Sequence, residues 1–157
     1  MSDAGDVPPP AIFDIPRLLI ATDAGYDPIV RLATQSQHFS QVNAPVLVLF
    51  GAGDSFPFKP RPSTILVSGM PDGVIACVPS LDEFGVASRL ASTAGLPGCY
   101  DGPVTELGEL WLQSLDPTAL AQVQIIVSGA DETVRAAEEL GRRLGVPVGA
   151  IPAISRS

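Results

Sequence analysis

The sequence predicts an α/β fold in which a mostly parallel sheet carries helices on both faces. Short apolar runs alternate with segments of helical periodicity along most of the chain. The runs are apolar at consecutive positions, as in strands that are buried on both faces. The connections are short, which favours right-handed crossovers between parallel strands. We therefore expect a three-layer domain around a five-stranded, mostly parallel sheet.

Five segments have the composition of such buried strands. They are residues 17–21, 45–50, 86–91, 123–127 and 146–150. Each is a run of about five residues bounded by glycine, proline or polar residues, the usual length and setting of a strand. A further segment, residues 64–67, can add an edge strand.

Four segments have the periodicity or the boundary residues of helices. They are residues 28–37, 72–84, 103–115 and 131–144. We expect Asp27 to cap the first helix, and Pro79 to kink or split the second. The fourth begins with acids and ends with Arg142 and Arg143, as the helix dipole prefers.

One domain is expected over residues 17–151, since the chain of 157 residues is long enough for one core. Residues 1–16 are acidic and rich in proline, and we expect a poorly ordered tail there. Residues 152–157 are expected to form a second, short tail.

Composition excludes several classes of function. Hydrophobic residues make up 46% and charged residues 17%, which argues against disorder over most of the chain. The net charge of -8 and the scattered basic residues argue against nucleic-acid binding. No apolar run is long enough to span a bilayer, and no signal peptide is recognisable, so a cytoplasmic protein is expected.

The residues that carry metal and nucleophile chemistry are few. Cys77 and Cys99 are too few for a zinc or iron–sulfur site from this chain alone. His38 is the one histidine and follows a helix, where a solvated side chain is expected. We therefore predict no catalytic residues and no metal ligands.

Parallel sheets bind ligands at the carboxyl ends of their strands, so the candidate site residues are those that follow the predicted strands. The candidates for cofactor binding are Thr22, Asp23, Gly25, Asp54, Cys99, Ser128 and Gly129.

Several of these positions have a second interpretation. The Gly25 turn is either a dinucleotide phosphate loop or a tight turn that needs one glycine. Asp54 either accepts a hydrogen bond from a ribose or serves a turn. Ser128 contacts a ligand, caps the following helix, or does both. Cys99 is on a loop expected to line the crevice, although no basic residue nearby would lower the pKa of its thiol.

Three segments together carry a family resemblance. Residues 18–28 hold an apolar strand, Gly25 and a proline that opens a helix; residues 98–107 hold spaced glycines followed by a Val-Thr pair. Residues 125–131 hold a strand that ends in a glycine loop before a helix. In this order they resemble the NAD(P)-binding domain of the ferredoxin–NADP reductase superfamily over residues 17–150, closest to the electron-transfer subunit of dihydroorotate dehydrogenase.

The chain departs from that family at its phosphate-binding loop. Ala21, Thr22 and Ala24 replace glycines, and Asp23 lies between them. Side chains there obstruct the approach of a pyrophosphate, and a carboxylate repels it. Ser128 stands where the family has cysteine. The glycine motifs are thus eroded, and the resemblance implies NAD(H) or NADP(H) as the candidate cofactor.

The family's flavin barrel and cysteine cluster have no counterpart in this sequence. Residues 1–16 are too few for a flavin domain. We therefore expect neither a flavin nor an iron–sulfur centre from this chain alone, and no autonomous redox catalysis.

Three classes of function stay open. The favoured one is a degenerate nucleotide-binding domain that is non-catalytic alone and acts through protein contacts. The alternative is an NAD(P)H-binding electron-transfer component whose flavin domain is on another chain. A free-standing enzyme or small-ligand binder that uses the same crevice differently is the third.

A proline-rich segment over residues 56–62 suggests a partner surface. Its prolines hold it extended, and it carries Phe56 and Phe58 with two basic residues. Two phenylalanines on such a segment either pack on their own domain or dock a partner. We hypothesise an interface with a second copy of the chain or with a flavin-containing redox partner.

Overall fold

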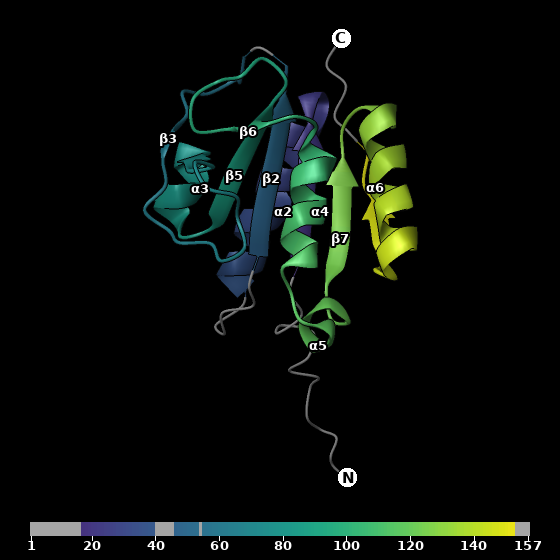
Figure 1. Ribbon diagram of the computed structural model, residues 1–157. Coiled ribbons are helices and arrows are strands. Elements are labelled where there is room, and N and C mark those ends of the chain that lie inside the picture. The colour runs from purple at the N-terminus through teal and green to yellow at the C-terminus, as the bar shows by residue number, and fades with distance from the viewer. Residues whose placement is uncertain (1–16, 40–45, 54, 153–157) are drawn as a thin grey trace.

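The computed structural model describes residues 17–39, 46–53 and 55–152, and we discuss those only (Figure 1). The tail predicted at residues 1–16, residues 153–157 of the tail predicted at 152–157, and the candidate Asp54 lie outside the described residues. His38 belongs to a helix, but its side chain also lies outside the described part.

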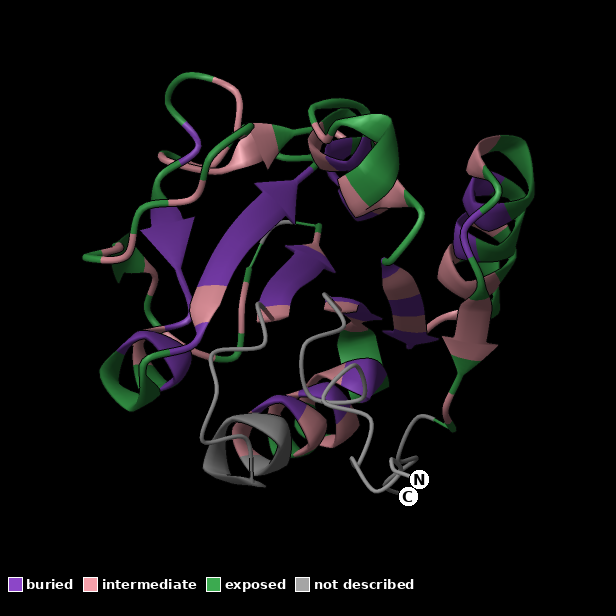
Figure 2. Cartoon of the chain, turned by 90° about the horizontal axis from the view of Figure 1, so that it is seen from below, coloured by how far each residue is buried: buried purple, intermediate pink, exposed green. Residues whose placement is uncertain are grey.

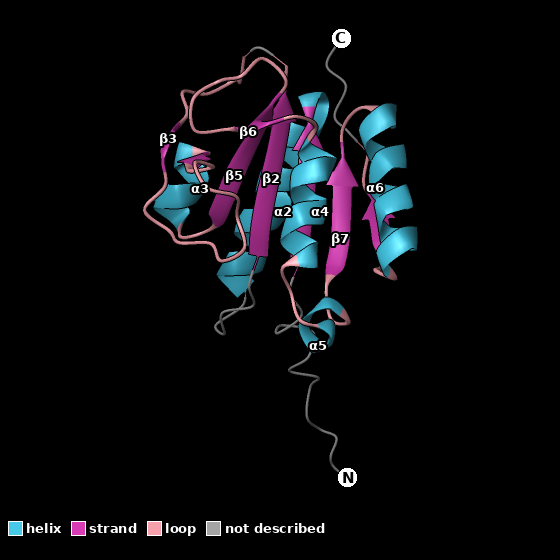
Figure 3. Cartoon of the chain, viewed as in Figure 1, coloured by secondary structure: helices cyan, strands magenta, loops and turns pink. Residues whose placement is uncertain are grey.

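A parallel sheet forms the centre of the molecule (Figure 3). The strand order is β6-β5-β2-β1-β7-β8, and every neighbouring pair is parallel. The strands are β1 (Arg17–Thr22), β2 (Val46–Ala52), β5 (Ala87–Ser92), β6 (Tyr100–Asp101), β7 (Gln124–Ser128) and β8 (Val148–Ala150). The predicted fold class is confirmed. The predicted number of five strands is wrong, because the two residues of β6 extend the sheet beyond β5.

Helices cover both faces of this sheet. They are α2 (Tyr26–Phe39), α3 (Pro79–Phe84), α4 (Val104–Gln113), α5 (Pro117–Leu120) and α6 (Asp131–Leu144), with a 3-10 turn η1 (Asp23–Gly25) before α2. Seen along the sheet, the buried strands lie between α2 on one side and α4 and α6 on the other (Figure 2). This is the three-layer arrangement expected from alternating strands and helices.

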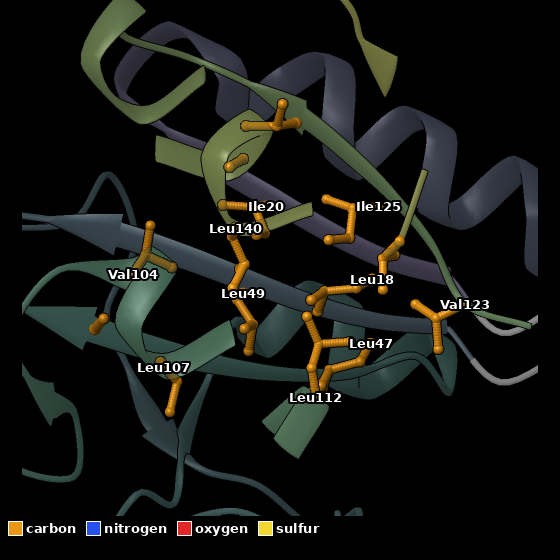
Figure 4. Packing of buried hydrophobic residues seen from close by; sticks show 14 of the residues in the cluster. Leu18, Ile20, Leu47, Leu49, Val104, Leu107, Leu112, Val123, Ile125 and Leu140 are labelled. Atoms are coloured by element: carbon orange, nitrogen blue, oxygen red, sulfur yellow. The ribbon is translucent and has the colours of Figure 1, made fainter. Parts of the chain in front are cut away.

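Two hydrophobic cores fill the spaces between these layers. Successive residues of β1 serve them in turn: Leu18 and Ile20 pack towards α4 and α6, whereas Leu19 packs towards α2. All three side chains are fully buried. Figure 4 shows the first core, in which Leu107 of α4 and Leu140 of α6 meet the sheet. Burial on both faces explains why the strands read as continuous apolar runs.

The segment between β2 and β5 differs from its prediction. Residues 72–78 are not helical, since Gly73 takes a φ of +85° and residues Ala76–Cys77 form strand β4. This strand pairs antiparallel with β3 (Arg61–Pro62). Only Pro79–Phe84 is helical, with Pro79 at the first position, where its missing N–H costs nothing. The edge strand predicted at 64–67 is wrong as well, because that segment is irregular.

The first helix also begins earlier than predicted. The turn η1 runs directly into α2 at Tyr26, so Asp27 lies in the first turn of the helix and does not cap it. An acid in the first turn is still favourable for the helix dipole.

A buried carboxylate fixes the irregular segment that follows β3. Asp82 is 8% exposed and accepts hydrogen bonds from Ser63 Oγ at 2.6 Å and from the Thr64 N–H and Oγ1 at 3.1 and 2.9 Å. Nearby, Arg89 is 5% exposed and donates to the Ile65 carbonyl at 2.6 Å. These side-chain bonds replace the ladder that a strand would have made, which explains the irregular course.

This carboxylate predicts a pH dependence of stability. Burial alone would raise the pKa of Asp82, but the hydrogen bonds from Ser63 and Thr64 outweigh it, and the pKa is lowered. A lowered pKa stabilises the fold above the pKa of unfolded aspartate, about 3.9, and this stabilisation is lost as the pH falls through the folded value. We expect Asp82→Asn to reduce the free energy of unfolding by about 2 kcal/mol at neutral pH, and by less in acid. Urea unfolding at several pH values measures this, and a pH-independent loss would contradict it.

Candidate functional site

The strand order reverses between β1 and β7, and a cavity opens there. From β1 the chain continues through β2 to β5 on one side, whereas α4 leads across to β7 and β8 on the other. Such a switch point leaves a crevice at the carboxyl ends of the strands. A cavity of about 440 Å³ lies in this place, lined by the ends of β1, β2 and β5 and by the beginnings of α4 and α6. Its volume is within the range of small-molecule sites.

Thr22 joins the end of β1 to the beginning of α6. Its Oγ1 donates a hydrogen bond to Thr133 Oγ1 at 3.0 Å and accepts one from the Ala130 N–H at 3.2 Å. Helix α6 has Ala130 as its N-cap and no side-chain cap of its own, so Thr22 satisfies the first free N–H from another element. Thr22 itself lines the cavity.

Asp23 lines the cavity in an uncommon backbone conformation. Its φ is +51°, and among the described residues it is the one non-glycine with a positive φ. This region favours glycine, although aspartate tolerates it better than most side chains. The exposed carboxylate of Asp23 therefore lies on a turn with the conformation that a glycine adopts readily.

Gly25 and Gly129 bring the β1 and β7 loops into direct contact. A Cβ at Gly25 would lie 2.0 Å from the Ser128 carbonyl oxygen, and a Cβ at Gly129 would lie 2.3 Å from Thr22 Oγ1. Gly129 also has a φ of +143°. Neither glycine is among the residues that line the cavity. Because the two glycines have no side chain, the backbones of the loops after β1 and β7 can approach closely. The edge of the site depends on this contact.

Ser128 lies on the other face of the sheet. It pairs with Ala21 of β1, which belongs to the core on the α2 side, and its side chain is fully buried. Its Oγ has no hydrogen-bond partner among the described atoms. Ser128 does not cap α6, so the interpretation as a helix cap is wrong.

Cys99 lies apart from the cavity. Its half-buried side chain packs against the core on the α2 side, and it is not among the cavity-lining residues. Burial raises the pKa of its thiol, which keeps the thiol protonated at neutral pH. The expectation that its loop turns Cys99 into the crevice is therefore not met. Gly102 and Pro103 of that loop and the first two residues of α4, Val104 and Thr105, line the crevice instead.

Four cavity residues with polar side chains were not among the candidates from the sequence. Thr93 follows β5, Thr105 lies in the first turn of α4, and Glu132 and Thr133 lie in the first turn of α6. The sequence signal that could have identified the three threonines is a hydroxyl residue directly after a strand or at the start of a helix. Among the described lining residues the charged ones are Asp23 and Glu132, and both are acidic.

A tyrosine–glutamate pair braces the loop at the start of α4. Tyr100 Oη donates to Glu106 Oε1 at 2.7 Å, and a Cβ at Gly102 would lie 2.9 Å from the Tyr100 ring. This hydrogen bond, with burial and the nearby charges of Glu106 and Asp101, raises the pKa of Tyr100 to about 12.

We expect Glu106→Gln to lower the pKa of Tyr100 towards the ordinary value of about 10, because both the charge and the strong acceptor are lost. Ultraviolet titration of tyrosinate in a Tyr26→Phe background isolates the Tyr100 signal. An unchanged titration after Glu106→Gln would show that the pair does not form.

Phe56 and Phe58 pack on their own domain. Their rings stack with centroids 5.3 Å apart, and both contact Phe50, each at 5.7 Å. Phe58 also stacks on Tyr26 at 5.5 Å. Of the two possibilities left open by the sequence, packing within the domain is therefore realised for both rings. Among the large hydrophobic side chains of the described residues, the most exposed are elsewhere, at Leu66 (96%) and Ile75 (52%).

Among the described residues, no helix is long and apolar enough to cross a membrane. In the same part of the chain, no group of three or more histidine, cysteine, aspartate or glutamate residues is placed to hold a metal ion.

Comparison with known proteins identifies the fold. No protein-family model matches the chain, and no curated protein sequence does. Among solved structures the chain is similar to the ferredoxin reductase in carbazole 1,9a-dioxygenase (FAD apo form), with a TM-score of 0.53 and 18% sequence identity. The match covers 87% of this chain and 34% of that chain, so this chain spans about a third of the reductase. At this identity the likeness shows the fold alone: the chain has a ferredoxin-reductase-like α/β fold.

Proposed function

We propose that this chain is a degenerate nucleotide-binding domain that is non-catalytic alone and acts through contacts with other proteins. Within the ferredoxin-reductase-like fold we place it nearest to the electron-transfer subunit of dihydroorotate dehydrogenase, on the three ordered sequence segments. One observation carries the proposal: both charged side chains among the described cavity-lining residues, Asp23 and Glu132, are acidic.

The charges at the cavity favour exclusion of a dinucleotide. The N-termini of α4 and α6 meet the cavity, and each contributes about half a positive charge. Two carboxylates outweigh these two helix ends by about one negative charge. A further negative charge at the cavity is therefore repelled, and because both carboxylates are exposed this repulsion weakens as salt is added.

The conformation of Asp23 supports the idea that this turn is an altered phosphate loop. Because its φ of +51° suits glycine, Asp23→Gly needs no change of backbone course. The substitution removes the carboxylate and opens the turn to a ligand at the same time.

Isothermal titration with NADH and NADPH tests the proposal. We expect no measurable binding by the wild type and weak but measurable binding by Asp23→Gly. Ala24→Gly is the matched control, since it adds a glycine to the same exposed turn and keeps the carboxylate. Micromolar binding by the wild type would contradict the proposal.

The alternative function is an NAD(P)H-binding electron-transfer component that works with a flavin domain on another chain. The position and volume of the cavity favour it, because both suit a ligand at a topological switch point. NAD(H) and NADP(H) are then the candidate cofactors. Micromolar binding of either by the wild type would establish this function as the better account.

A domain that acts through contacts with other proteins needs an exposed surface on which the partner can bind. Phe56 and Phe58 pack against Phe50. We therefore place the contact surface on another part of the segment between β2 and β5, where Leu66 and Ile75 are exposed. A second copy of the chain or a flavin-containing redox partner are the proposed occupants. Multi-angle light scattering over a range of concentrations tests the first, and a strict monomer would leave the redox partner.

A further inference from the structure

Two neighbouring grooves lie on the α2 side of the sheet, and both are lined by Phe58 and Lys59. The larger groove has a volume of about 660 Å³ and includes Tyr26 and Arg61. The other has a volume of about 560 Å³ and includes Phe56. Among the described lining residues, neither groove shares any with the cavity at the carboxyl ends of the strands, so the grooves form a separate surface.

The apolar walls of the grooves consist of aromatic rings and prolines. The Phe58 ring stacks with the rings of Tyr26 and Phe56, at centroid distances of 5.5 and 5.3 Å, and all three side chains are only half-buried. The prolines in the same walls are Pro57, Pro60, Pro79 and Pro97. Grooves lined by aromatic rings bind extended, proline-rich segments, whose conformation is set before binding.

The charges at the grooves favour an acidic segment. Lys59 is the one lysine of the sequence; it is exposed and has no ion-pair partner among the described residues. Arg61 pairs with Glu83 at 3.1 Å, and both side chains are exposed. A surface ion pair of this kind contributes little stability, so Arg61 can exchange its partner at small cost. The two basic residues outnumber Glu83 in the walls of the grooves.

The first sixteen residues of this chain have the matching composition. Residues 1–16 hold three aspartates and no lysine, arginine or histidine. Within them, residues 8–10 are consecutive prolines, which keep a chain extended. The two other segments outside the described part do not match, because residues 40–45 carry no charge and residues 153–157 carry an arginine and no acid. Residues 1–16 are therefore the part of this chain that complements the grooves.

This segment is long enough to reach the grooves of its own molecule. Arg17 begins β1, and Ala21 of β1 pairs with Phe50, whose ring lies 5.7 Å from that of Phe58. At about 3.3 Å per residue, Ala21 is about 13 Å along β1 from Arg17. The chain between Asp6 and Arg17 spans up to about 36 Å when extended. The reach exceeds the separation along the strand, so binding within one chain is possible.

We infer that residues 3–10 bind in the two grooves of their own molecule, with the prolines against the aromatic rings and with Asp3 and Asp6 beside Lys59. This inference goes beyond the proposed function and does not depend on the loss of nucleotide binding. While the segment is bound it covers the rings of Tyr26, Phe56 and Phe58, so this face of the domain is closed to other proteins.

Zero-length carbodiimide cross-linking of the full chain, followed by peptide mass spectrometry, tests the inference. The reagent joins a lysine amine to a carboxylate in contact with it, and Lys59 provides the one such amine in the sequence. We expect amide bonds from Lys59 to Asp3 or Asp6. In a mixture of isotope-labelled and unlabelled chains, we expect the linked peptides to carry a single label, because both ends belong to one chain.

Replacement of the prolines separates binding from random encounter. We expect Pro8→Ser, Pro9→Ser and Pro10→Ser together to lower the yield of these links at least about fivefold, because a flexible segment loses more entropy on binding. The substitutions change no residue of the sheet, the helices or the two cores, so a loss of links is not due to unfolding. Ala4→Ser keeps the aspartates and the prolines; it is the matched control and should leave the yield unchanged.

Three results would overturn the inference. The first is the absence of any link from Lys59 to Asp3 or Asp6. The second is an equal yield after replacement of the three prolines, which would mean that the segment meets Lys59 only by chance. The third is a set of links that join labelled to unlabelled chains at the statistical ratio, which would place the segment on a second copy.

Discussion

Gly25→Ala is expected to destabilise the fold by more than about 3 kcal/mol, the range of mutations that force backbone apart in a packed region. A Cβ at this position would lie 2.0 Å from the Ser128 carbonyl oxygen and 2.7 Å from the Gly129 nitrogen. Both are backbone atoms, so no side-chain rotation relieves the clash. The loops after β1 and β7 must separate, and the core beneath them opens.

Urea unfolding measures this loss, and Gly149→Ala is its matched control. A Cβ at Gly149 of β8 meets no atom within 4 Å, so that substitution is expected to leave the midpoint unchanged or to raise it slightly. If Gly25→Ala and Gly149→Ala had the same midpoint, the close contact of the two loops would be refuted.

Gly129→Ala is expected to reduce the free energy of unfolding by about as much as Gly25→Ala does, for two additive reasons. Its φ of +143° is strained for any other residue, and a Cβ there would lie 2.5 Å from the Thr22 carbonyl oxygen. We expect a loss of about 3 kcal/mol and a displacement of Thr22 from the beginning of α6.

A second readout separates this local displacement from general destabilisation. Thr22→Val removes the two hydrogen bonds to Thr133 and Ala130 without a clash, and we expect it to cost about 1–2 kcal/mol. If Thr22→Val and Gly129→Ala act through the same contact, the double variant will lose less than the sum of the single losses. Simple additivity would contradict the shared contact.

The sequence predicted the central layers well because local pattern and tertiary burial agree there. Residues 17–21 are apolar at successive positions, and β1 is buried on both faces. The five predicted strands are present with ends displaced by two residues or fewer. The last helix was predicted with its full bounds, since its charges follow the dipole and Gly145 ends it with a φ of +71°.

The segment between β2 and β5 could not be predicted in the same way. Its course depends on Asp82 and Arg89, which reach residues 63–65 from distant positions in the sequence. Strand β6 has two residues and exists because Ala91 and Ser92 pair with it. Interactions of this kind carry no local periodicity, and a single sequence does not reveal them.

The candidate site was predicted in place but only partly in its residues. Thr22 and Asp23 line the cavity because they follow a central strand. Ser128 follows one as well, but alternation along β7 turns its side chain to the α2 face. Thr105 and Thr133 enter the site from helix starts, and their approach depends on how the helices pack on the sheet.

Nuclear magnetic resonance titration of the isotope-labelled full chain with NADH tests the central claim most directly. The amides to follow are those of residues 22–23, 102, 104–105, 130 and 132–133, which line the cavity. We predict no saturable shift at these amides up to millimolar NADH, because Asp23 and Glu132 repel the pyrophosphate. Saturable shifts there at micromolar NADH would contradict the claim that this domain has lost dinucleotide binding.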